Sequence, residues 1–235
     1  MMPPQIRPKY KQIIIRFFKA EKLPLLDVNL LGKATSIDAY LTCKYLSHKL
    51  TTDVITAKEA DRIDWNTEFL LPVQLPVMSG RVAMQIYDKD NIKDEIVGSI
   101  LFNLKECMEP SNNGKFSWCN IYGAPLGHRG SITDTMNSNP EAASAWKGRI
   151  LVQVLSEDTE KPTCIKRKID PKNFDLAKPY MEMREYDVIA DVYSGIALPS
   201  EDKYRVMIKI ADFELITEAP KFALKNYNRW NCRFR

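Results

Sequence analysis

The chain has 235 residues, of which 45% are hydrophobic and 27% are charged, as is typical of a globular protein. Its 34 Lys and Arg residues and 30 Asp and Glu residues give a net charge of +4, so the balance argues against nucleic acid as a partner. The five cysteines are an odd number and form no C-x-x-C pair, which predicts free thiols in a reducing compartment. The N-terminus has no apolar signal segment, and charges interrupt every apolar run before the length of about 18 residues that would predict a transmembrane helix.

Short apolar segments with period-two alternation, separated by polar turns, dominate the first two thirds of the chain. This pattern predicts β-strands rather than helices. We expect an all-β fold, an eight-stranded antiparallel β-sandwich over residues 10–156, preceded by an N-terminal tail at 1–9. The predicted strands are 12–19, 38–45, 49–56, 69–75, 81–87, 97–104, 116–122 and 149–155.

Two segments interrupt this rhythm. Residues 123–148 are rich in Gly, Ser, Asn, Thr and Pro and predict a long, exposed and partly disordered insertion. Residues 157–180 are charged and contain three prolines, which predicts a linker that carries the basic run 166–168. Strand patterns resume in 181–235, but two or three strands cannot close a sandwich. We therefore expect an incomplete second β unit there, whose unpaired edge could support a homodimer.

Two loops next to strand ends carry clustered carboxylates. Asp88 and Asp90 are spaced so that an extended strand directs both side chains to one side, where like charges repel unless a cation lies between them. Calcium, which accepts several oxygen ligands in flexible geometry, would suit such a cluster. A solvated acidic turn beside Lys89 and Lys93 is the alternative. The carboxylates of the two loops are those of Asp27, Asp38, Asp88, Asp90, Asp94 and Glu95.

The order of short motifs resembles that of a C2 domain over roughly residues 10–156. The motifs are L-P-x-x-D at 23–27, I-D-A-Y-L at 37–41, W-N-T-E-F at 65–69 and I-Y-D-K-D…I-V-G at 86–98. The segment starts at the L-P strand and ends on an I-L-V-x-V strand, which resembles the permuted, type II topology. The long first loop, the compact D-x-D loop and the W-C-N-I-Y-G motif are similar to an internal C2 domain of a ferlin. The tail resembles the start of a following C2-like unit.

This resemblance implies calcium bound by Asp27 and Asp38 of the first loop and by Asp88, Asp90 and Asp94 of the third loop. Glu95 is the alternative to Asp94, because both cannot take the same place. The resemblance also implies binding to anionic phospholipid at the cytoplasmic face of membranes, in vesicle fusion or exocytosis, by part of a membrane-anchored parent protein. Other C2 domains or fusion proteins would be its partners.

A second hypothesis stays open, that of a degenerate C2 domain that binds no calcium and acts as a protein-interaction or intramolecular packing module. The wide separation of Asp27 and Asp38 and the short third loop favour it. A lysine that reaches into the acidic cavity would favour it further.

Membrane contact is predicted at the tips of the acidic loops, from Leu30, Leu31 and Ile92, because exposed apolar residues on a rim indicate such a surface. Lys44 and Lys49 form a small basic patch that suits anionic headgroups, or else an ordinary solvated strand face. The chain contains no G-x-S-x-G, P-loop, G-x-G-x-x-G or H-E-x-x-H motif. We therefore do not expect an enzyme.

Overall fold

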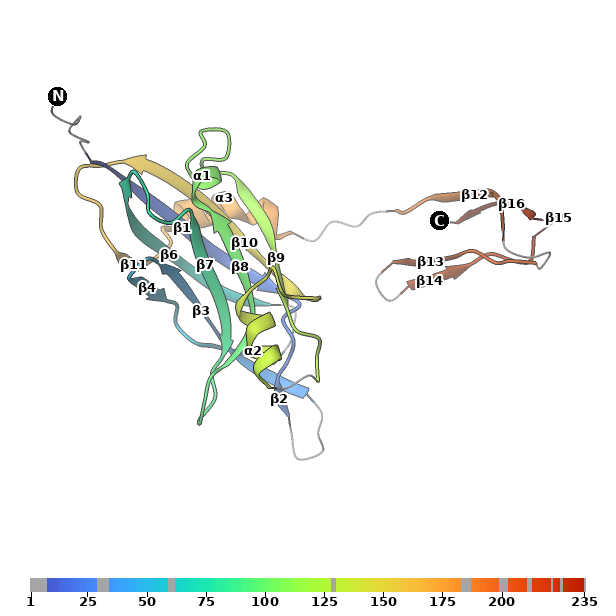
Figure 1. The fold of residues 1–235 in the computed structure, drawn as a ribbon, viewed down its shortest axis with the longest axis horizontal. Coiled ribbons are helices and arrows are strands. Elements are labelled where there is room, and N and C mark those ends of the chain that lie inside the picture. Colours follow the sequence, from blue (N-terminus) through green and yellow to red (C-terminus); the bar gives the residue numbers. More distant parts are fainter. Residues whose placement is uncertain are drawn as a thin grey trace, which may run out of the picture. The chain divides into compact units, whose positions relative to one another are not determined.

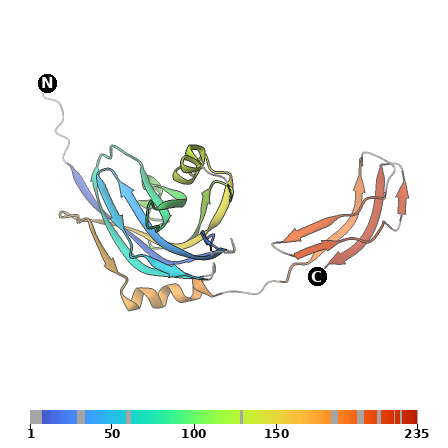
Figure 2. The ribbon, with the colours of Figure 1, turned by 90° about the horizontal axis from the view of Figure 1, so that it is seen from below.

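The computed structural model describes residues 8–28, 34–58, 62–127, 130–182, 187–198, 203–210, 213–220, 222–224 and 226–234. The chain divides into two units, 1–182 and 183–235. The first unit is an antiparallel β-sandwich (Figures 1 and 2), as predicted, but its described residues form eleven strands rather than eight, because short edge strands without clear alternation add to it. Its strands are β1 (Lys9–Glu21), β2 (Asp27–Val28), β3 (Ala34–Tyr45), β4 (His48–Thr51), β5 (Ile55–Ala57), β6 (Ile63–Leu75), β7 (Arg81–Asp88), β8 (Glu95–Asn103), β9 (Phe116–Gly123), β10 (Ala145–Asp158) and β11 (Ile165–Lys168).

One layer of the sandwich has the strand order β11-β6-β1-β10-β9, and the other has β8-β7-β3, with β2, β4 and β5 all paired to β3. A single residue pair, Ser99 with Tyr122, joins the layers between β8 and β9. The first strand, β1, lies beside β10, so the sandwich begins and ends on neighbouring strands. This is the adjacency that the permuted topology predicts.

The length of β1 follows from its nearly continuous apolar sequence. Ile13, Ile15 and Phe17 face the main core between the layers, whereas Phe18 belongs to a second small core on the outer face. The two adjacent phenylalanines face opposite sides because successive side chains of a strand alternate between its faces. A strand buried on both faces reads as continuous rather than alternating hydrophobicity.

The region expected to be a linker is instead part of the first unit. β11 pairs with β6, with Ile165 opposite Leu70, and α3 (Pro171–Met181) covers the second core through Ala177. Asp170 caps this helix by accepting a hydrogen bond from the Lys172 N–H, and Pro171 occupies its first turn. The linker prediction for 157–180 is therefore wrong, because Pro171 and Pro179 belong to a capped helix and the basic run 166–168 to an edge strand.

The insertion expected at 123–148 also contains regular structure. Its residues 131–138 form α2 (Ser131–Ser138), which packs beside β8 and β9 (Figure 1). The Asn137 side chain fixes the helix, since its Oδ1 accepts a buried hydrogen bond of 2.7 Å from the Ala124 N–H. A further short helix, α1 (Leu104–Cys107), follows β8. None of the described helices has the length and apolar character needed to cross a bilayer.

The described part of the second unit is entirely β-structure. It has a three-stranded sheet, β12-β16-β15, and a two-stranded hairpin of β13 and β14. Trp230 is buried, and its indole N–H donates to the Tyr204 carbonyl at 3.2 Å. The interpretation of this unit as an incomplete C2-like domain, and its role in dimerisation, stay predictions. The bounds are β12 (Ala190–Ile196), β13 (Met207–Ile210), β14 (Phe213–Ile216), β15 (Phe222–Leu224) and β16 (Tyr227–Phe234).

Candidate functional site

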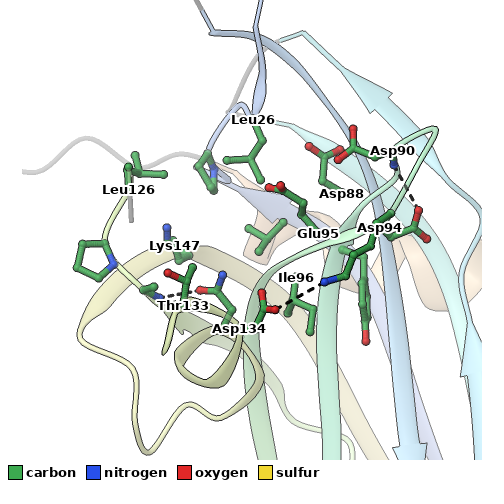
Figure 3. Close-up of a pocket in the computed structure, with 18 of the residues that line it drawn as sticks. Leu26, Asp88, Asp90, Asp94, Glu95, Ile96, Leu126, Thr133, Asp134 and Lys147 are labelled. Carbon is green, nitrogen blue, oxygen red and sulfur yellow. Dashed lines mark hydrogen bonds and ion pairs between the residues drawn. The ribbon is translucent and has the colours of Figure 1, made fainter. Parts of the chain in front are cut away.

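A hollow of about 860 Å³ lies at the end of the sandwich where the two acidic loops meet the insertion (Figure 3). One wall comes from the end of β7 and the start of β8, and the other comes from residues 124–127, α2 and Lys147. The acidic residues that line it are Asp27, Asp88, Asp90, Asp94, Glu95 and Asp134.

Asp88 is the most deeply placed of these acids. It ends β7, is only 1% exposed, and its Oδ1 accepts a 2.8 Å hydrogen bond from the Asp38 N–H. Burial raises the pKa of Asp88 to about 6, and the negative charges of Asp27, Asp90 and Asp38 contribute to the rise, against that hydrogen bond. The first and third loops therefore bring their carboxylates within electrostatic range of one another.

The two acids of the first loop have different surroundings. Asp27 lines the hollow, and its Oδ2 accepts a 2.9 Å hydrogen bond from the Ser36 hydroxyl. Asp38 does not line the hollow, and its Oδ1 accepts from the Thr56 hydroxyl on the neighbouring strand β5. Asp38 supports Asp88 through its backbone rather than facing the hollow with its carboxylate.

The third loop binds the Asp94 carboxylate to its own backbone and to neighbouring side chains, since the Asp90 N–H donates to Asp94 Oδ1 at 3.3 Å. Asp94 accepts a 2.6 Å hydrogen bond from the Tyr40 hydroxyl and a second from Lys89 Nζ at 3.0 Å. These two hydrogen bonds lower the pKa of Asp94. Figure 3 shows the carboxylates of Asp88 and Asp90 side by side, with Glu95 directed into the hollow and Asp94 turned away toward the strands. The geometry therefore favours Glu95 over Asp94 as the additional acid facing the hollow.

The donor set of this wall consists of carboxylate oxygens, which suits a hard cation such as calcium. Within the described ranges, however, no three His, Cys, Asp or Glu side chains stand close enough together to hold a metal ion as they are. The acids facing the hollow fit calcium by their chemistry but would have to draw closer to coordinate it.

Lys147 reaches the hollow because of a bulge in β10. The register shifts between Trp146 and Arg149, so Lys147 and Gly148 together oppose the buried Ile121. A bulge of this kind redirects a side chain, and Lys147 is only 7% exposed although its flanking residue Trp146 is half exposed. Burial lowers the pKa of Lys147.

Gly148 should be required for this bulge. Its φ is +111°, and a Cβ would lie 2.5 Å from the Glu21 carbonyl oxygen, a backbone atom that cannot easily move. We expect Gly148→Ala to lower the free energy of unfolding by about 1–3 kcal/mol, measured by urea denaturation. Gly80→Ala is the matched control, since nothing lies within 4 Å of its added methyl group. Equal stability of the two variants would contradict the argument.

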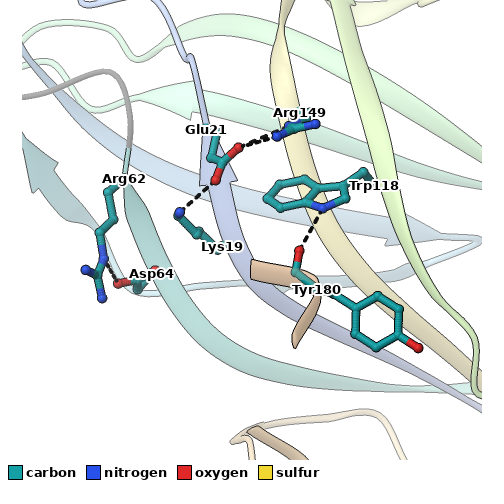
Figure 4. A network of polar contacts seen from close by, with 7 residues as sticks. All are labelled: Lys19, Glu21, Arg62, Asp64, Trp118, Arg149 and Tyr180. Atoms are coloured by element: carbon teal, nitrogen blue, oxygen red, sulfur yellow. Dashed lines mark hydrogen bonds and ion pairs between the residues drawn. The ribbon is translucent and has the colours of Figure 1, made fainter. Parts of the chain in front are cut away.

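A polar network behind the bulge ties β1, β9, β10 and α3 together (Figure 4). Arg149 donates two hydrogen bonds to Glu21, at 3.0 and 2.8 Å, and stacks 4.3 Å above the Trp118 ring. The Trp118 indole N–H donates to the Tyr180 carbonyl at the end of α3. Burial acts to raise the pKa of Glu21, but hydrogen bonds from Lys19 and Arg149 outweigh it, and the net pKa is lowered. These contacts hold the part of β10 that follows the bulge against β1, β9 and α3.

Exposed apolar side chains occur on the loops and the helix that form the hollow, and Leu126 lines it. Ile92, at the tip of the third loop, is fully exposed, and Leu126 and Ile132 of the insertion are largely exposed. Contact of Ile92 with a membrane stays a prediction. The predicted contacts Leu30 and Leu31 lie outside the described residues. Leu126, Ile132 and Lys147 were not predicted from the sequence. Leu126 and Ile132 could have been found as isolated apolar residues in a polar insertion, and Gly148 near the start of a strand could have indicated the bulge beside Lys147.

The basic patch predicted on the strands is present as a cross-strand pair. Lys44 on β3 lies directly opposite Lys49 on β4, and both are exposed. They are toward the opposite end of β3 from Asp38. The basic run 166–168 is not free, since Lys166 and Lys168 pair with Asp53, and Arg167 pairs with Glu68.

Comparison with known proteins gives two kinds of similarity. The chain is 22% identical to mouse myoferlin and 23% identical to human myoferlin, over 84% of its own length but only 11% and 12% of theirs. Among solved structures it is similar to a C2 domain of plant extended synaptotagmin 1 (19% identity, TM-score 0.46, 66% of this chain and all of that one). It is also similar to a calcium-bound pair of C2 domains from extended synaptotagmin 2 (18% identity, TM-score 0.49, 97% of this chain and 73% of that one). No protein-family model matches the chain.

Proposed function

We propose that the C2 domain of a ferlin-like protein, which this chain contains, binds anionic phospholipid membranes in a calcium-dependent manner. The observation that carries the proposal is Asp88, a buried carboxyl group crowded by the charges of Asp27, Asp90 and Asp38 at one end of the sandwich. Such crowding is unfavourable unless a cation neutralises it. Asp27, Asp88, Asp90 and Glu95 would hold calcium, with Asp38 supporting them and Asp94 free to join after leaving Lys89.

The same end of the sandwich has the residues that a membrane-binding tip needs. Ile92, Leu126 and Ile132 are exposed on the loops and the helix that form the hollow, and each such side chain contributes about 1.5–3 kcal/mol if fully buried. Bound calcium would offset the repulsion between the carboxylates and anionic lipid. Lys44 and Lys49 lie toward the other end of β3, and they would add attraction of about 1 kcal/mol each only where the membrane also reaches that strand face, reduced by salt.

The cellular setting follows from the similarity to myoferlin and extends the proposal. We infer a place at the cytoplasmic face of membranes, in vesicle fusion or exocytosis, with other C2 domains or fusion proteins as partners. The proposal assigns no catalytic activity to the chain.

The calcium-independent alternative has specific support. Lys89 already pairs with Asp94 at 3.0 Å, Lys93 pairs with Asp134 at 3.7 Å, and Lys147 lines the acidic hollow. These three ammonium groups could take over part of the role of a calcium ion. The domain would then bind membranes or proteins without responding to calcium.

Calcium titration by calorimetry, together with vesicle sedimentation, tests the proposal. We expect the full chain to bind calcium and to sediment with phosphatidylserine-containing vesicles in calcium but not in EDTA or with pure phosphatidylcholine. The double variant Asp88→Asn/Asp90→Asn should lose both properties. Asp158→Asn is the matched control, because Asp158 lies at the far end of β10, paired with Lys11. Sedimentation that is equal in calcium and EDTA would favour the alternative.

A further inference from the structure

The bulge in β10 places the Lys147 side chain in a largely buried position beside the hollow, and lysine is rare in such positions unless it is paired. Lys147 is buried, and no described residue forms a hydrogen bond or ion pair with it. Its aliphatic stem is covered by protein, whereas Nζ is open to the hollow, and a Lys on this strand could lie in bulk solvent if the bulge were absent. A lysine whose stem is buried, and whose Nζ faces an open hollow without a partner among the described residues, points to a ligand that supplies the missing negative charge.

The first turn of α2 faces the same hollow. Gly130, the N-cap residue, and Thr133 both line it, and Gly130 has no side chain to cap the free N–H groups of the turn. The N-terminus of a helix carries partial positive charge and bonds readily to phosphate oxygens. Asn137 anchors α2 to the backbone of Ala124, so this turn is held in place relative to Lys147.

The carboxylates of the hollow limit what can bind there. Asp134 is paired with Lys93 and Asp94 with Lys89, so neither opposes an anion with its full charge. Asp27, Asp88, Asp90 and Glu95 form the opposite wall, and they would repel an anion until a cation neutralises them. An anion bound to Lys147 would therefore lie between a basic wall and the proposed calcium wall.

We propose that Lys147, the first turn of α2 and the Thr133 hydroxyl form a subsite for a phosphate group. The subsite deepens the proposed function and rests on it, because calcium on the opposite wall is what makes room for the anion. Lys147 Nζ and the free N–H groups of α2 donate hydrogen bonds to the phosphate oxygens. The phosphate belongs either to a phospholipid headgroup or to a soluble phosphate ester, since the chemistry recognised is the same.

Lys147→Met tests the subsite, because Met keeps the length of the side chain and removes its charge. Thermal unfolding of the full chain is followed with glycerophosphate, and with glycerol as the neutral control, in calcium and in EDTA. We expect glycerophosphate with calcium to stabilise the wild type and to bind Lys147→Met at least about tenfold more weakly. The matched control is Lys105→Met, an exposed lysine on the distant helix α1. Thr133→Val, which keeps Lys147, should weaken binding by a smaller factor.

The calcium titration separates this inference from the proposed function. If Lys147→Met binds calcium normally but loses the glycerophosphate effect, the subsite is supported. If calcium binds and the glycerophosphate effect is absent from the wild type, or equal in Lys147→Met, the subsite is overturned and the proposed function stands. If the wild type binds no calcium, the proposed function fails. A glycerophosphate effect in EDTA that requires Lys147 would then keep the anion subsite but overturn its dependence on calcium, and its absence would end both.

Vesicles distinguish the two sources of the phosphate group. Loss of calcium-dependent sedimentation of Lys147→Met with phosphatidic acid vesicles would assign the subsite to a lipid headgroup. Unchanged sedimentation together with a lost glycerophosphate effect would assign it to a soluble ester.

Discussion

Asp88→Asn should raise the melting temperature of the chain in EDTA at pH 7, although it removes a proposed calcium ligand. Asp88 is buried and its pKa is raised to about 6, so its ionised form is unfavourable in the folded state. A rise in pKa of this size corresponds to at most about 3 kcal/mol, or about 6–12 °C in a domain of this size. Asn keeps an oxygen that accepts the hydrogen bond from the Asp38 N–H.

The pH dependence of this effect has a defined sign. The folded-state pKa of Asp88 lies above its ordinary value of 3.8, so the folded state retains a proton that the unfolded state has lost between these two pH values. The free energy of unfolding of the wild type should therefore fall as the pH rises from about 4 to about 6. Urea denaturation should show equal stability of wild type and variant near pH 4 and the full difference by pH 7. A variant less stable than the wild type in EDTA would contradict the argument.

Calcium should reverse the order of the two melting temperatures. A ligand that binds only the folded state stabilises it by an amount that grows with its concentration, and Asp88→Asn lacks that gain. Asp158→Asn controls for the loss of a surface carboxylate, because the Asp158 side chain is largely exposed. If the wild type remains below Asp88→Asn at every calcium concentration, calcium does not bind at Asp88.

The sandwich was predictable because apolar and polar residues alternate along its strands, and this alternation matches the observed burial of one strand face. β7 alternates exposed or half-buried with buried residues along its whole length, which is the pattern of a strand with one face in the core. β11 gave no such signal, because all four residues of this edge strand are exposed. In α3, Asp170 and Pro171 form an ordinary helix start. The two further prolines between 157 and 180 made the segment look like a linker, so this helix signal did not lead to a helix prediction. Both elements are held by contacts with residues far away in the sequence.

The acidic loops were predictable from spacing, whereas the roles of their members were not. The engagement of Asp94 depends on Tyr40, which β3 places beside Tyr87 on β7. Lys147 enters the hollow only because β10 carries an extra residue opposite Ile121. Neither relationship can be seen without the register of the strands, so sequence alone identified the acidic wall and missed the basic one.

Glu68→Ala should be among the most destabilising single substitutions in the first unit. Glu68 lies on β6 between β1 and β11, its side chain is 3% exposed, and it pairs with Arg16 at 2.5 Å and with Arg167. Its removal leaves Arg16, itself 12% exposed, as a buried charge without its carboxylate. Breaking a buried ion pair in this way costs about 3–5 kcal/mol, which urea denaturation would measure.

Arg167→Ala is the matched control within the same cluster. Arg167 is 53% exposed, and without it Glu68 keeps its pair with Arg16, so the loss should be about 1 kcal/mol or less. A large loss for both variants would mean that the attachment of β11 to β6, rather than the buried charge of Arg16, governs the stability of this edge. A small loss for both would mean that Arg16 is satisfied by Gln153, whose Oε1 lies 2.8 Å from its guanidinium.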